Sequence, residues 1–258
     1  MRTMKDNMQH FVEELNTRGF VVLDNTLSEE QFSALNRAVD RYLERFPFAT
    51  SEWVKSGSAS YQAMDVLPKT SDFDSAIESP VTLSLARAFF GEEVTFEHLS
   101  ILIRNPELNP AEPKGWHRDN TRDYNRRKEI GAISVIYYLT DVSETDHCFS
   151  IVPETHNRLV DLRPEEVNPG DETDITGPAG TTIIFQARCI HSGKVKPNSR
   201  RRRTLHVYYW QAGKPRTSTT STIPIRLHQK SDPGLPPKLY SKWNVHDVLD
   251  AIGRKKEY

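Results

Sequence analysis

His117, Asp119 and His191 are the residues of this chain whose types and spacing could do chemistry. His117 and Asp119 stand two positions apart, and side chains at that spacing on an extended segment point the same way. A second imidazole, from His191 on a later strand, would complete three donors on one face of a metal ion. Two histidines and one carboxylate in this arrangement leave coordination positions open, as in non-haem Fe(II) oxygenases. The three residues are therefore predicted to form an iron site.

An arginine stands at a useful distance beyond these residues. Arg202 follows His191 by eleven positions, within a run of four arginines at 200–203. The side chains that share its face on an extended segment are Thr204, His206 and Tyr208. A guanidinium binds a carboxylate through two parallel hydrogen bonds and stays charged, which suits a dicarboxylate co-substrate such as 2-oxoglutarate. Arg203 is the alternative anchor, and the spacing leaves both open.

The elements that must position these residues change in character along the chain. Periodicity predicts helices first, with Ser28 as an N-cap and Gly91 as a stop, and then short strands joined by Pro, Gly and Asn turns. The expected helices cover residues 4–18, 28–45 and 79–90. The expected strands cover residues 20–23, 94–103, 115–119, 131–139, 148–152, 181–185, 189–192 and 204–210.

This order predicts a mainly β fold with flanking helices. We expect a double-stranded β-helix (a jelly roll, cupin-like), with the N-terminal helices packed on one sheet. A chain of 258 residues can form one such domain. Residues 1–92 would be the helical front, 93–212 the jelly-roll core, and 213–258 a tail that ends in a short helix at 243–252.

Composition narrows the class of partner. The formal net charge of −1 argues against nucleic acid, because no chain-wide basic surface is available. Two cysteines, Cys148 and Cys189, fit a reducing cytoplasm better than a disulfide framework. No signal peptide or membrane-length apolar run is visible. A cytoplasmic monomer or homodimer that acts on a small molecule is expected.

Several motifs follow one another in a characteristic order. They are Gly-Phe-Val-Val-Leu at 19–23 with Leu-Ser-Glu-Glu at 27–30, Trp-His-Arg-Asp at 116–119, Val-Pro-Glu-Thr-His at 152–156, Pro-Ala-Gly-Thr at 178–181 with the later His191, and Asn-Ser-Arg-Arg from 198. From about residue 10 to 210 the chain resembles the phytanoyl-CoA dioxygenase family of Fe(II)/2-oxoglutarate oxygenases. Gly193 departs from the pattern, since many relatives have a serine there.

The resemblance implies roles for particular residues. It makes His117, Asp119 and His191 the iron ligands and Arg202 the anchor of 2-oxoglutarate. The implied reaction uses O2 and 2-oxoglutarate to hydroxylate or otherwise oxidise a C–H bond of a small molecule, with release of succinate and CO2, in specialised metabolite biosynthesis. A lipid or acyl-CoA hydroxylase and a non-catalytic binding protein of the same fold are the alternatives. Asp119 argues against halogenation, which requires a small residue at that position.

Other polar residues leave two interpretations each. His206 fits a hydrogen-bonded core histidine or a substrate contact, and Cys189 fits a buried inert thiol or a lining group. His156 is expected to be structural. Four further residues fit either a solvent-exposed position or a contact with substrate at the mouth of the site: Asp123, Tyr124, Lys194 and Lys196.

Overall fold

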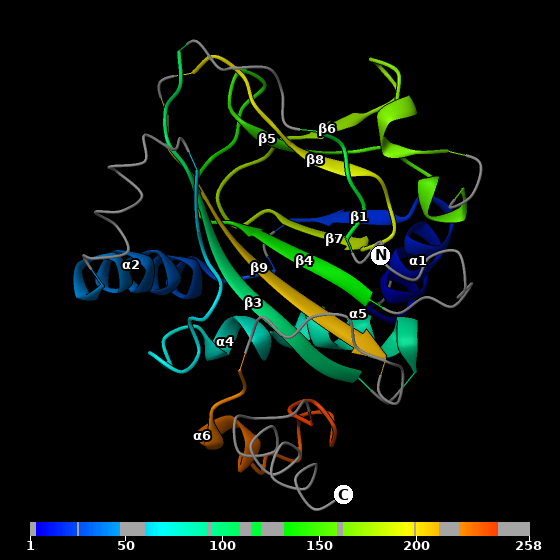
Figure 1. The fold of residues 1–258 in the computed structure, drawn as a ribbon. Helices are drawn as coiled ribbons and strands as arrows, with labels where there is room; N and C mark the ends of the chain where they lie inside the picture. Colours follow the sequence, from blue (N-terminus) through cyan, green and yellow to red (C-terminus); the bar gives the residue numbers. More distant parts are fainter. Residues whose placement is uncertain are drawn as a thin grey trace, which may run out of the picture.

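Two antiparallel β-sheets face each other in the computed structural model, which describes residues 4–24, 26–46, 60–91, 94–108, 115–119, 132–158, 162–198, 200–211 and 222–241 (Figure 1). The larger sheet has the strand order β1-β7-β4-β9-β3-β2, and the smaller has the order β6-β5-β8. The larger sheet comprises β1 (Phe20–Leu23), β2 (Ser60–Ala63), β3 (Val94–Arg104), β4 (Ala132–Tyr138), β7 (Thr182–Gln186) and β9 (Arg202–Gln211). The smaller comprises β5 (Cys148–Ile151), β6 (Thr173–Ile175) and β8 (His191–Lys194).

Helices cover the face of the larger sheet that is turned away from the smaller one (Figure 1). They are α1 (Met4–Thr17), α2 (Glu29–Arg45), α4 (Asp74–Ile77) and α5 (Pro80–Phe90). Their apolar side chains share one buried cluster with alternate residues of β3, β4 and β9. The short helix α6 (Ile225–His228) lies in the C-terminal part, and short 3-10 helices cover Thr155–Asn157 and Pro164–Glu166. Helices packed on one sheet were predicted, and this is confirmed.

Alternation along β9 separates the helix-covered face from the face toward the smaller sheet. Leu205, Val207 and Tyr209 belong to the helix-side cluster and are fully buried. The intervening residues face the space between the sheets, because side chains of a strand alternate. A second buried cluster fills part of that space, with Ile136 and Tyr138 of β4 among its members. The predicted jelly-roll class is confirmed, as two antiparallel sheets that do not close into a barrel.

The predicted helix ends agree with the structure. Ser28 Oγ accepts from the backbone N–H of Gln31, and the Gln31 side chain accepts from the N–H of Ser28, which forms a capping box. Gly91 follows α5 with a φ of 85°, a conformation that favours glycine. No helix within the described ranges combines the length and apolar character needed to cross a bilayer.

Some predicted elements differ from the observed ones. The strand expected at 115–119 is only a bridge at His117, because a single residue of the segment pairs with β8. The strand expected at 189–192 begins instead at His191, after a turn. β2 and β6 were not predicted; both are short and carry little apolar alternation. The helix expected at 243–252 lies outside the described residues.

Candidate metal centre

His117 and His191 lie directly opposite each other in an antiparallel bridge. The N–H of each donates to the carbonyl oxygen of the other, at 3.0 and 2.9 Å. Side chains of directly opposed residues lie on the same side of such a pair, so both imidazoles point the same way. The N–H of Asp119 donates to the carbonyl of Ala187 at 3.0 Å, which extends the contact and brings its carboxylate to that side. The backbone therefore assembles three donors that are distant in sequence.

The three side chains converge on one point. One donor atom from each of His117, Asp119 and His191 lies within 4.8 Å of the others. The Nε2 atoms of His117 and His191 lie 3.6 and 3.5 Å from the two carboxylate oxygens of Asp119. Atoms bound to one divalent ion lie roughly 3 Å apart, so a small closing movement would complete coordination. Within the described part of the chain, no other three His, Cys, Asp or Glu residues converge in this way.

Neighbouring groups orient each of these side chains. His191 Nδ1 donates to the carbonyl of Cys189 at 2.9 Å, and His117 Nδ1 lies 3.4 Å from the carbonyl of Gly115. These contacts leave both Nε2 atoms for a metal. The hydroxyl of Tyr208 donates to Asp119 Oδ2 at 2.7 Å. Such supporting bonds fix the orientation of metal ligands and contribute to metal affinity.

The electrostatics favour an ionised carboxylate. Burial by itself would raise the pKa of Asp119, but the adjacent His191 and the hydrogen bonds from His191 and Tyr208 hold it well below its usual value. Burial, together with His191, lowers the pKa of His117. Burial also opposes the charged form of His191, but Asp119 outweighs it and the pKa of His191 is raised. Asp119 is thus ready to provide negative charge to a cation.

Arg118, between the first two donors, anchors the segment that carries them. Its side chain turns inward, and its Nη1 donates to the carbonyl of Thr155 at 2.6 Å and to that of Arg188. Its Nη2 donates to the carbonyls of Arg158 and Leu162, at 3.1 and 3.0 Å. The guanidinium thus ties residues 115–119 to two other parts of the chain. The sequence analysis did not predict this role. The only signal for it in the sequence is a cation that stands between two predicted metal ligands, His117 and Asp119.

The structure separates the two candidate arginines. Arg203 turns to the helix-covered face, where its Nη2 lies 2.7 Å from Asp40 Oδ1 of α2. Arg202 turns to the opposite face, and its Nη2 is the nearest atom to the position that a Cβ on Gly193 would occupy, at 3.7 Å. Arg202 Nη1 is buried and makes no hydrogen bond to the described residues. Burial, with Arg104 nearby, lowers the pKa of Arg202. No carboxylate of the described residues pairs with this guanidinium, although a buried cation requires a counter-ion.

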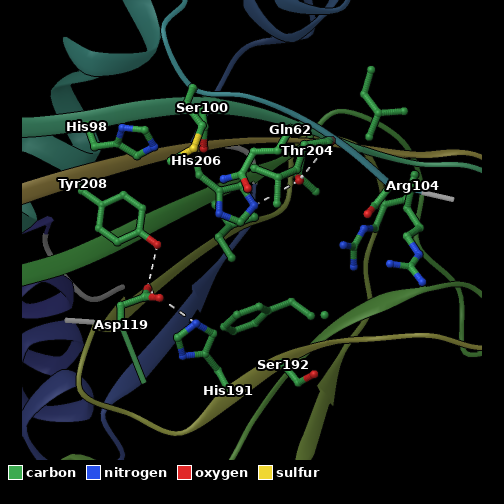
Figure 2. Close-up of a pocket in the computed structure, with 18 of the residues that line it drawn as sticks. Gln62, His98, Ser100, Arg104, Asp119, His191, Ser192, Thr204, His206 and Tyr208 are labelled. Atoms are coloured by element: carbon green, nitrogen blue, oxygen red, sulfur yellow. Dashed lines mark hydrogen bonds and ion pairs between the residues drawn. The ribbon is translucent and has the colours of Figure 1, made fainter. Parts of the chain in front are cut away.

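Arg202 and the three metal-centre residues line one cavity of about 580 Å³ between the sheets. Figure 2 shows Asp119 and His191 of this lining, with Tyr208 beside Asp119. Thr204, His206 and Tyr208 line it as well, so the predicted face of β9 is confirmed. The apolar lining comes from Leu102, Ile103, Ile136, Tyr138, Phe149 and Phe185. The cavity therefore joins a three-donor centre to a guanidinium that has no anionic partner among the described residues.

The remaining candidates fall into two groups. His206 faces the cavity, with Nε2 3.1 Å from Thr204 Oγ1, so it is hydrogen-bonded but is not a core residue. Cys189 is fully buried, with its thiol 3.5 Å from the carbonyl of Gly19, and burial raises its pKa to about 12. His156 Nε2 donates to the carbonyl of Asn16 at 3.0 Å. Cys189 does not line the cavity, which favours the inert-thiol interpretation, and the contact of His156 fits the structural role expected of it.

The two lysines near the mouth are held in ion pairs. Lys194 Nζ lies 2.8 Å from Glu172 and 3.1 Å from Asp174, and Lys196 Nζ lies 2.8 Å from Asp174. These pairs favour a structural surface role for both lysines. Asp123 and Tyr124 lie outside the described residues.

The donor set fits iron and a dicarboxylate. Two imidazole nitrogens and one carboxylate on one side of a point form the arrangement that Fe(II) oxygenases use, with the opposite side left for other ligands. The buried guanidinium fits the far carboxylate of 2-oxoglutarate, which would supply its missing counter-ion.

Comparisons with known proteins agree with this arrangement. The family model described as phytanoyl-CoA dioxygenase (PhyH) matches residues 15–204. A protein from Stutzerimonas stutzeri named "probable alpha-ketoglutarate-dependent hypophosphite dioxygenase" is 23% identical, over 53% of this chain and 52% of its own. The chain thus spans about half the length of this relative.

Solved structures share the fold at low sequence identity. The non-haem alpha-ketoglutarate-dependent carbocyclase SnoK from nogalamycin biosynthesis superposes with a TM-score of 0.63, at 19% identity, over 88% of this chain and 92% of its own. HygX from Streptomyces hygroscopicus, solved with nickel, 2-oxoglutarate and hygromycin B, gives a TM-score of 0.63 at 13% identity, over 80% and 88%. At these identities the likeness shows the fold alone.

Proposed function

Because the chain belongs to the phytanoyl-CoA dioxygenase family, we propose that it is an Fe(II)- and 2-oxoglutarate-dependent dioxygenase that oxidises a small molecule. One observation carries this proposal: the same cavity is lined by a His-Asp-His centre and by the guanidinium of Arg202, whose buried Nη1 has no hydrogen-bond partner among the described residues. The reaction would be a hydroxylation or a related C–H oxidation in specialised metabolite biosynthesis. The structural neighbour SnoK comes from nogalamycin biosynthesis, which supports this setting.

Each cavity residue has a distinct task in this proposal. His117 and His191 would hold Fe(II) through Nε2, and Asp119 through its carboxylate. Arg202 would bind the far carboxylate of 2-oxoglutarate and so direct its keto-acid end toward the metal. Bound iron would supply the oxidising chemistry, using O2 and 2-oxoglutarate and releasing succinate and CO2.

Other residues keep the site ordered and dry. The hydroxyl of Tyr208 fixes the carboxylate of Asp119, since it donates to Oδ2 at 2.7 Å. The aromatic rings of Phe149 and Phe185 pack beside His191, with centroids 5.5 and 4.7 Å from its ring. These rings exclude water from the inner side of the centre, and a low dielectric strengthens the electrostatic contacts there.

Turnover without added substrate tests the proposal. The purified protein, given Fe(II), 2-oxoglutarate and O2, should release succinate slowly, and His117→Ala should abolish that release because one iron ligand is lost. His10→Ala, an exposed histidine on α1, is the matched control and should keep it. Iron-dependent succinate formation that survives in His117→Ala would contradict the assigned centre.

We further propose a cytoplasmic enzyme that acts as a monomer or homodimer. The two cysteines support a reducing compartment, since Cys148 and Cys189 are both buried free thiols. Chromatographic mass measurement of the purified protein tests the oligomeric state.

A further inference from the structure

Two arginines lie side by side at the end of the cavity that is farther from the metal centre. Arg104 of β3 pairs directly with Arg202 of β9, and both residues line the cavity. Side chains of directly opposed residues lie on the same face of a sheet. Tyr208, which donates to Asp119, lies six positions farther along β9. Figure 2 accordingly shows Arg104 on the opposite side of the cavity from Asp119. We call the end with Arg104 and Arg202 the arginine end.

The protein itself leaves donors of both guanidiniums without partners. Among the described residues, Arg104 hydrogen-bonds only to Glu107, from Nη2 to Oε2 at 3.3 Å. Its Nε is buried and has no hydrogen-bond partner there, and the same is true of Nη1 of Arg202. A well-formed arginine–carboxylate pair uses two parallel hydrogen bonds of about 2.7–2.9 Å. The single, longer contact with Glu107 therefore leaves Arg104 able to bind a second anion.

Backbone contacts hold Glu107 next to Arg104. The N–H of Glu107 donates to the carbonyl of Asn198 at 3.1 Å, and the N–H of Asn198 donates back to Glu107 at 3.0 Å. His147 Nε2 donates to the carbonyl of Asn105 at 3.1 Å, which fixes the residue that follows Arg104. Glu107 does not line the cavity. It therefore contacts Arg104 from outside and leaves the inner side of this guanidinium to a ligand.

The charges at the arginine end favour an anion. Burial lowers the pKa of Arg202, and the neighbouring cation Arg104 lowers it further. Among the described residues, the acids that line the cavity are Asp119, in the metal centre, and Glu97, at the other end of β3. Neither acid lies between the two arginines. An anion bound there would remove the repulsion between two like charges in a partly buried place.

A carboxylate suits this position. Each of its two oxygens can accept from one guanidinium. In the proposed function the far carboxylate of 2-oxoglutarate reaches Arg202, which brings it beside Arg104 as well. Gly193 of β8 leaves room for it, because even a Cβ at this residue would come no closer than 3.7 Å to Arg202 Nη2. One carboxylate, together with Glu107, would balance the two arginines in charge.

We propose that Arg104 is a second anchor of 2-oxoglutarate, and that the far carboxylate is held between the guanidiniums of Arg104 and Arg202. This inference rests on the proposed function. Glu107 orients Arg104 in the free protein and offsets part of its charge, so it competes with the co-substrate for this arginine. Two anchors select a dicarboxylate over a 2-oxo acid that ends in a methyl group.

Calorimetry on the Fe(II)-loaded protein under anaerobic conditions tests the contact. Arg104→Met should raise the Kd for 2-oxoglutarate about tenfold, because hydrogen bonds between charged groups are lost. The Kd for 2-oxovalerate, which has the same chain length but no far carboxylate, should not change. Arg104→Lys keeps the charge without the fork, so it should give a smaller rise, and it serves if the methionine variant fails to fold.

Two results of these measurements would overturn the inference. The first is an unchanged Kd for 2-oxoglutarate in the Arg104 variants, which is expected if this arginine binds an anionic substrate instead. The second is an equal rise in Kd for both oxo acids, because an effect that does not depend on the far carboxylate would reach the ligand through the metal centre or through general damage.

Glu107 supplies a test of opposite sign. Glu107→Gln removes the competing charge, so the Kd for 2-oxoglutarate should fall about threefold. In the double variant with Arg104→Met, the Kd should equal that of Arg104→Met alone. A purely structural ion pair predicts an unchanged or higher Kd in Glu107→Gln, and that result would also overturn the inference.

Controls separate binding from loss of an ion pair in general. Arg41→Met and Asp72→Asn each break a 2.9 Å ion pair between α2 and the segment before α4, and both should keep the Kd of the natural protein. The melting temperature of each variant reports its folding. Absence of 2-oxoglutarate binding in the natural protein loaded with Fe(II) would instead refute the proposed function.

Discussion

Replacing Arg202 with methionine should change stability and binding in opposite directions. Arg202 Nη1 is buried without a hydrogen-bond partner among the described residues, and burial lowers the pKa of the group. The free protein therefore carries the cost of an uncompensated cation, which methionine of similar length would relieve. The same substitution removes the proposed anchor of the far carboxylate of 2-oxoglutarate.

The expected magnitudes follow from these contacts. A buried unsatisfied polar group costs about 1–3 kcal/mol, so Arg202→Met should raise the free energy of unfolding of the ligand-free protein by about 1 kcal/mol or more. That corresponds to a rise in Tm of about 2–4 °C. Loss of a bidentate charged contact should cost about 3 kcal/mol or more in binding, or roughly a hundredfold in the Kd for 2-oxoglutarate.

Thermal unfolding and calorimetry measure both effects. At 2-oxoglutarate concentrations near 100 times Kd, the natural protein should gain about 2.7 kcal/mol of stability, and Arg202→Met should gain almost none. Arg203→Met is the matched control, because this neighbour pairs with Asp40 on the other face of β9. It should lose at most about 1 kcal/mol of stability and keep its affinity. Weakened binding in Arg203→Met together with unchanged binding in Arg202→Met would refute the reasoning.

Three further substitutions have defined outcomes. Tyr208→Phe removes the hydrogen bond to Asp119 Oδ2 and should weaken metal binding about 10–100-fold, measured by titration with Fe(II) under anaerobic conditions. Gly19→Ala places a methyl group against the thiol of Cys189 in a backbone with a φ of 85°, so the free energy of unfolding should fall by about 2 kcal/mol or more, measured with denaturant. Arg118→Met leaves the carbonyls that it binds without a donor, and should destabilise the protein by about 3 kcal/mol or more, measured in the same way.

Controls distinguish these effects from general damage. Tyr208→Phe should not change the Kd for 2-oxoglutarate analogues that do not contact the metal. If the affinity for the metal is not changed either, the supporting role proposed for the hydroxyl is wrong. Gly91→Ala shares the positive φ of Gly19 but meets no atom within 4 Å, so it isolates the backbone contribution. An equal loss in the two glycine variants would contradict the proposed steric clash. A stable Arg118→Met protein would show that its carbonyl contacts matter little.

The sequence predicted the elements whose hydrophobic period is long and regular. The helices that begin after Ser28 and Ser79 and the long strands β3, β4 and β9 were expected close to their observed bounds. β2 and β6 were missed because short polar strands carry almost no period-two signal. The strand expected at 115–119 became a bridge, since its pairing depends on a distant backbone rather than on its own residues.

The candidate site divides in the same way. The cluster of His117, Asp119 and His191 was anticipated from residue type and order, and the face of Arg202 from simple alternation along β9. The carbonyl contacts of Arg118 could not be read from the sequence, because they join segments that only the fold brings together. The β-bulge at Glu97, where Phe96 and His98 pair with consecutive residues of β9, was not predicted for a related reason. A bulge shifts the alternation by one residue, and nothing in the local composition marks it.

The bridge between His117 and His191 has a consequence for the folding of the chain. These two residues are far apart in sequence, so an ion bound by both would act as a cross-link that closes a long loop. Closing such a loop removes conformational entropy from the unfolded chain, and metal-binding free energy then adds to folding free energy. Bound iron would therefore stabilise the folded chain in addition to its role in the reaction. Removal of the iron with a chelator should lower the melting temperature even when no substrate is present.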